Sequence, residues 1–120
     1  VFKNYHTAPG ALEGMRDLVA LADRYPATTL VLAEVPLHPA IYTDFLPAAD
    51  YDALIAAIEA STSAQSVPFL RSAALVLPPD GVWKDSIHLN GRGAALFSAW
   101  LGEQTARALG TPYAAAWPQD

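Results

Sequence analysis

The sequence predicts an α/β fold whose strands run parallel. Stretches with apolar residues at helical spacing alternate along the chain with short apolar runs, in the order helix, strand, loop, helix, strand, loop, helix. This alternation is typical of a parallel sheet covered by helices. The run 28–35 is apolar and β-branched, as expected of a strand buried on both faces. Because two strands do not form a stable parallel sheet alone, we expect further strands from upstream chain.

Each predicted helix has a stop or start signal beside it. The helices are predicted at 11–25, 51–61 and 91–109, and the strands at 28–35 and 67–70. Pro26 ends the first helix, because the residue before a proline avoids helical angles. Asp50 and Asn90 are the expected N-caps of the second and third helices, and Gly110 ends the third. The buried stripe predicted for the third helix consists of Phe97, Trp100, Leu101 and Leu109.

Composition narrows the class of protein. The 120 residues are 52% hydrophobic, which is enough for the core of one small domain, and they carry 12 acidic against 7 basic residues. An acidic balance argues against nucleic acid or an anionic membrane as the main partner. The absence of cysteine excludes disulfides, thiolate metal sites and a cysteine nucleophile. No run approaches the roughly 18 to 20 apolar residues of a membrane span, and the opening residues do not resemble a signal peptide.

The segment 85–90, Asp-Ser-Ile-His-Leu-Asn, is the strongest candidate for chemistry. It places the carboxylate of Asp85 three residues before the imidazole of His88, where a loop leads into the last predicted helix. A carboxylate that holds one ring nitrogen leaves the other free, and this is the orienting and basic half of a nucleophilic triad. The alternative is that Asp85 is a loop or capping residue and that His88 packs at the start of the helix.

Two more residues are predicted near the same edge of the sheet, where ligands bind in open α/β folds. His38, between Pro36 and Pro39, would bind substrate there, or it would only bond to nearby backbone. Trp83 would line one side of an apolar or sugar-binding groove, or it would only pack in the core or a loop.

Two further interpretations concern a possible metal site and the acid inside the first strand. His38, Asp85 and His88 together would offer a His/His/Asp metal set, although nothing in their spacing demands one, and we expect neither a metal nor another cofactor. Glu34, inside an apolar run, is either a buried acid with a partner or a residue at the sheet edge.

Residues 85–94 resemble the last conserved block of the SGNH/GDSL hydrolase family, which precedes that family's C-terminal helix. The order of elements from the first helix through the strand that ends in Glu34, Val35 and Pro36 is also similar. The resemblance implies a three-layer α/β/α sandwich with a parallel, flavodoxin-like sheet, of which residues 1–120 form the C-terminal part of a single domain. It also implies a serine ester hydrolase or O-acyltransferase in which Asp85 orients His88, the general base.

Within that family, the chain is most similar to branches that modify cell-envelope polymers such as alginate and teichoic acid. This likeness implies an acyl ester on a carbohydrate as the substrate and a location outside the cytoplasm, in the periplasm or at the cell surface.

The chain departs from the family in one large respect. The Gly-Asp-Ser block that carries the nucleophile is missing, as are the blocks that supply the oxyanion hole. The six serines, none of them in a nucleophile context, are Ser61, Ser63, Ser66, Ser72, Ser86 and Ser98. The chain also does not open on a methionine. We therefore expect the serine upstream in the same protein and this chain alone to be inactive. A catalytically silent module of the same fold, used for binding or assembly, is the main alternative.

Overall fold

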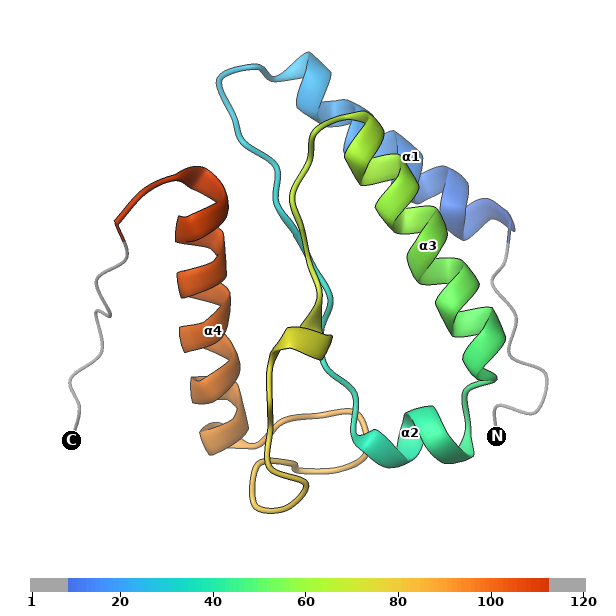
Figure 1. The fold of residues 1–120 in the computed structure, drawn as a ribbon, viewed down its shortest axis with the longest axis vertical. Coiled ribbons are helices and arrows are strands. Elements are labelled where there is room, and N and C mark those ends of the chain that lie inside the picture. Colours follow the sequence, from blue (N-terminus) through green and yellow to red (C-terminus); the bar gives the residue numbers. More distant parts are fainter. Residues whose placement is uncertain (1–8, 113–120) are drawn as a thin grey trace.

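The computed structural model describes residues 9–112, which form a mixed α/β fold (Figure 1). Its elements, in chain order, are α1 Pro9–Arg24, β1 Leu32–Ala33, α2 Pro39–Asp44, α3 Ala48–Ala64, β2 Phe69–Leu70, the 3₁₀ turn η1 Ser72–Ala74, and α4 Gly91–Leu109. The predicted alternation of helices and strands is confirmed. Helix α2 is additional, because the predicted loop between the first strand and the next helix contains it.

The two strands pair in parallel, with Leu32 opposite Phe69 and Ala33 opposite Leu70. The Leu32 N–H donates to the Pro68 carbonyl at 2.9 Å, and the Glu34 N–H donates to the Leu70 carbonyl at the same distance. Both strands are shorter than predicted, and Val35 is 61% exposed rather than buried on both faces. With a single neighbouring strand among residues 9–112, β1 pairs over two residues only, and Val35 lies beyond its end.

The helices lie on both sides of the strand pair. Helix α1 packs against α3, α4 contacts β2, and Figure 1 shows the strands running between α4 and the α1–α3 pair. Among residues 9–112 the buried apolar residues are few: Val19, Ile41, Ile55, Ile58, Val67, Val82 and Ala106. The stripe predicted for α4 is only partly covered, since Phe97 and Trp100 stack with their ring centroids 5.8 Å apart but are half-buried. Leu109 is 42% exposed, so its predicted burial is wrong for the part of the chain described.

The helix ends show which capping signals were informative. Asn90 caps α4 as predicted, because its side-chain oxygen accepts from the Gly93 N–H at 3.0 Å. Gly110 ends α4 in the left-handed conformation, with φ of 64°. The prediction for Asp50 is wrong, because α3 begins earlier, with Pro47 at the N-cap position. Asp50 instead lies in the first turn, where its carboxylate interacts favourably with the helix dipole.

Gly93 is required by the close approach of the loop before α4. The Val82 carbonyl accepts from the Asn90 N–H at 2.9 Å, and a Cβ on Gly93 would lie 2.1 Å from that same carbonyl oxygen. We expect Gly93→Ala to lower the free energy of unfolding by about 2–3 kcal/mol, as overpacking does. Chemical denaturation of the whole protein measures this change.

Gly91→Ala is the matched control for this substitution. Gly91 also lies in the first turn of α4, but a Cβ there meets nothing within 4 Å. Replacing it should leave the protein unchanged or stabilise it by up to about 1 kcal/mol, the helix preference for alanine over glycine. Equal stability of the two variants would contradict the packing of the loop against α4.

Candidate functional site

The loop that carries Asp85 and His88 is a tight turn held by its own backbone. Trp83 and Leu89 form an antiparallel bridge, and the Lys84 N–H donates to the His88 carbonyl at 2.8 Å. Inside this turn the Asp85 Oδ1 accepts from the Ile87 N–H at 2.9 Å and from the His88 N–H at 2.8 Å. An aspartate that bonds backbone two and three residues ahead fixes its own carboxylate in place.

The same carboxylate contacts the His88 ring. Nδ1 of His88 lies 2.9 Å from both Oδ1 and Oδ2 of Asp85. Because an ionised carboxylate only accepts hydrogen bonds, Nδ1 carries the proton of this contact, and the lone pair of the neutral ring is on Nε2. The predicted meeting of the two side chains is thus present in the structure.

The pair is open to solvent, with side-chain exposures of 64% for His88 and 48% for Asp85. Within residues 9–112, Nε2 of His88 has no hydrogen-bond partner. None of the six serine hydroxyls bonds to this ring. Ser72 is buried, for example, and the Ser61 hydroxyl donates to the Ala57 carbonyl inside α3. The arrangement can accept a proton from a group that approaches the loop from outside it.

The hydrogen bonds lower the pKa of the Asp85 carboxyl below its ordinary value of 3.8. The largest cause is the Ile87 N–H, followed by the His88 ring and then the His88 N–H. A carboxyl whose pKa is lower in the folded state stabilises the fold above its unfolded pKa and loses that contribution as the pH falls through the folded value. The turn should therefore stay intact at pH 5 and open only below pH 3.8.

An acid titration followed by NMR tests this expectation. The Ile87 and His88 amide resonances should shift together with a midpoint below 3.8, the ordinary value. The transition should vanish in Asp85→Asn, which has no carboxyl to protonate. A midpoint at or above 3.8 in the unchanged protein would contradict the hydrogen bonding described.

His38 lies next to this turn and has a structural role of its own. It is the N-cap of α2, where its Nδ1 accepts from the Ala40 N–H at 3.1 Å. Its backbone N–H donates to the Ser86 carbonyl at 3.3 Å, and its ring and that of Trp83 form a T-shaped pair with centroids 5.3 Å apart. The bonding to nearby backbone that the sequence left open is therefore observed. These contacts also tie the start of α2 to the turn that carries Asp85 and His88.

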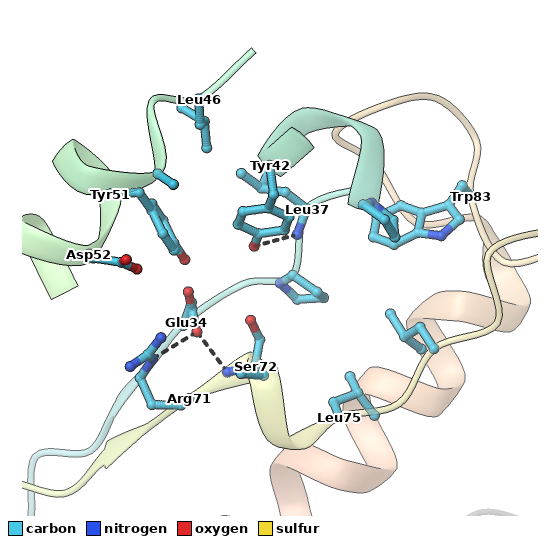
Figure 2. Close-up of a pocket in the computed structure, with 15 residues that line it drawn as sticks. Glu34, Leu37, Tyr42, Leu46, Tyr51, Asp52, Arg71, Ser72, Leu75 and Trp83 are labelled. Atoms are coloured by element: carbon cyan, nitrogen blue, oxygen red, sulfur yellow. Dashed lines mark hydrogen bonds and ion pairs between the residues drawn. The ribbon is translucent and has the colours of Figure 1, made fainter. Parts of the chain in front are cut away.

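Trp83 lines a cavity of about 410 Å³ next to the turn (Figure 2). Its indole Nε1 is buried and, among the described residues, has no hydrogen-bond partner. The cavity lies between the residues that follow β1, the start of α3 and the residues that follow β2. Both strands thus end at the cavity, which is where open α/β sheets bind ligands.

Glu34 proves to be a largely covered acid with partners. Its side chain is 10% exposed, and its Oε2 accepts from the Arg71 Nε at 3.2 Å and from the Ser72 N–H at 2.8 Å (Figure 2). Arg71 also bonds to Glu59 on α3 at 2.9 Å. Sequence reasoning missed Arg71 and Ser72, although both directly follow β2. A charged residue at the carboxyl end of a strand was the signal that could have identified them.

Two further findings concern metals and membranes. Among residues 9–112, no three or more His, Asp or Glu side chains gather in an arrangement that could hold a metal ion, so His38, Asp85 and His88 do not form a metal set. None of the helices in that range is both long and apolar enough to cross a membrane. The comparisons with protein-family models, curated proteins and solved structures gave no match to this chain.

Proposed function

We propose that this chain is the C-terminal part of a serine ester hydrolase or O-acyltransferase of the SGNH type, built as a three-layer α/β/α domain. The observation that carries the proposal is the Asp85–His88 contact, which leaves Nε2 of His88 unbonded on an exposed turn. The position of the strand pair between α4 and the α1–α3 pair supports the layered fold (Figure 1). The 85–94 segment supports the family assignment.

In the proposed reaction, a serine from another segment of the protein attacks the carbonyl carbon of an acyl ester. Nε2 of His88 takes the hydroxyl proton as the new C–O bond forms, and Asp85 stabilises the resulting imidazolium. The imidazolium then returns the proton to the alcohol that leaves when the original ester bond breaks. In the second half of the reaction, water (in a hydrolase) or an acceptor hydroxyl (in a transferase) attacks the acyl-serine, and Nε2 of His88 takes its proton. The imidazolium then returns a proton to the serine oxygen as the acyl–serine bond breaks. Hydrogen-bond donors from that other segment bind the oxyanion.

The proposed substrate is an acetyl or other acyl ester on a carbohydrate, and the proposed location of the protein is outside the cytoplasm. His38 and Trp83 are the proposed contacts to it, because both border the turn that carries the pair. A tryptophan offers a sugar ring a flat apolar surface.

A silent binding module of the same fold is the second candidate. It is favoured by one observation, that none of the six serines in the chain bonds to His88. Such a module would keep the sheet and the cavity and use them to hold a partner or a polymer without turnover.

Labelling by a serine-directed fluorophosphonate separates the two candidates. We expect the whole protein to take up one phosphonate on a serine outside residues 1–120, with loss of turnover of an acetyl ester, and EDTA to leave turnover unchanged. Mass spectrometry of the labelled peptides locates the serine. A folded protein that neither reacts nor turns over any ester would instead be the silent module.

A further inference from the structure

The cavity beside the Asp85–His88 turn is the right size for a small ligand and mostly apolar. Its volume of about 410 Å³ falls within the roughly 300–1,000 Å³ of small-molecule sites. Its lining includes the aromatic rings of Tyr42 and Tyr51 and four leucines, Leu37, Leu46, Leu75 and Leu77. Figure 2 shows these side chains around a shared space with Trp83 at one end. An apolar lining of this kind makes the burial of a hydrocarbon chain favourable.

Two of the three charged side chains that line the cavity, Glu34 and Arg71, are paired with each other. The Glu34 carboxylate bonds to Arg71 and to the Ser72 N–H, and Arg71 bonds to Glu59 as well. The Tyr42 hydroxyl accepts from the Leu37 N–H at 3.4 Å. The pKa of Tyr42 is raised, mainly because its side chain is partly buried, and its hydroxyl is therefore neutral. The third charged side chain of the lining, Asp52, is exposed and has no partner among the described residues, so an uncharged group fits the cavity better than an anion.

The cavity is joined to the proposed catalytic pair through Trp83. This residue forms the backbone bridge to Leu89, the neighbour of His88, and its ring also lines the cavity. On the other side, His38 contacts the Trp83 ring and bonds to the Ser86 carbonyl inside the turn. One end of the cavity is therefore formed by the same turn that carries His88, the proposed base.

We propose that this cavity binds the acyl chain of the ester, and that the enzyme prefers linear acyl groups longer than acetyl. The inference rests on the proposed function and deepens it, since it names the part of the substrate that the cavity holds. The acyl chain lies among the leucine and tyrosine side chains, and Trp83 stands at one end of the cavity. Each added CH₂ then strengthens binding about fourfold until the cavity is full.

The test measures binding without turnover. N-methyl amides of linear fatty acids, from acetyl to octanoyl, are added to the whole protein, and the Trp83 indole N–H resonance is followed by NMR. This resonance is assigned with Trp83→Phe. The dissociation constant should fall about fourfold per CH₂ and then level off.

Two neighbouring residues of η1 supply the matched variants. Ala73 lines the cavity and Ala74 does not, although both are exposed on the same short turn, so neither substitution threatens the fold. Ala73→Phe should fill the cavity and weaken hexanoyl amide binding at least tenfold, whereas Ala74→Phe should leave it unchanged. Binding that does not strengthen with chain length, or that survives Ala73→Phe, overturns the inference.

His88→Ala separates this inference from the proposed function. The variant should bind the amides like the unchanged protein, because the His88 side chain does not line the cavity. Binding with the expected chain-length dependence in a protein that neither hydrolyses an acyl ester nor transfers its acyl group would refute the proposed function alone. Ester turnover that depends on His88, in a protein whose amide binding does not depend on chain length, would refute the cavity's role alone.

Discussion

Replacing His88 with alanine should lower the turnover of an acyl ester by about 10⁴-fold or more in the whole protein. Without the imidazole, the attacking hydroxyl has no base within reach, and the leaving alcohol has no acid. The melting temperature should stay within about 1 °C, because a side chain that is 64% exposed contributes little packing. Steady-state kinetics and a thermal melt on the same sample measure both quantities.

Ser86→Ala is the matched control for His88→Ala. Ser86 is an exposed residue of the same turn, and the contact it makes there uses its backbone carbonyl, which alanine keeps. Its turnover should lie within about threefold of the unchanged protein. Turnover that persists in His88→Ala would show that another group is the base, and an equal loss in both variants would point to damage of the turn rather than of the chemistry.

The sequence predicted the order of elements well and their lengths less well. Apolar periodicity and stop signals located α1 and α4 to within a few residues, because Pro26 and Asn90 act locally. Both strands are shorter in the structure than predicted, because strand length depends on pairing with other strands, and a local sequence pattern carries no information about such pairing. Helix α2 was missed, since a six-residue helix between prolines has no periodicity to detect. His38, predicted to be a loop residue, is the cap that starts it.

The candidate site was predictable where its parts are close in sequence. Asp85 and His88 meet because a three-residue spacing on one turn allows little else once the carboxylate bonds to the Ile87 and His88 amides. The cavity was not predictable in this way. Glu34 and Arg71 are separated by 37 residues, and only the parallel pairing of β1 with β2 brings the ends of those strands together.

Asp85→Asn should lower turnover by about 10⁴-fold while the turn keeps its shape, as loss of the orienting acid does in serine enzymes. The asparagine oxygen still accepts from the Ile87 and His88 amides, so the backbone is held. The amide NH₂, however, donates where the carboxylate accepted. It therefore favours the tautomer of His88 with its proton on Nε2, which can no longer take a proton from a hydroxyl.

The ¹⁵N shifts of the His88 ring distinguish this orienting role from a merely structural one. Nδ1 should carry the proton in the unchanged protein and Nε2 should carry it in Asp85→Asn, with the Ile87 and His88 amide resonances nearly unmoved. Because Asp85 acts only through His88, the double variant Asp85→Asn, His88→Ala should be no slower than His88→Ala alone. Additive losses in the double variant would mean that Asp85 acts on the substrate directly, and a loss below tenfold in Asp85→Asn would mean that the ring needs no partner to act as a base.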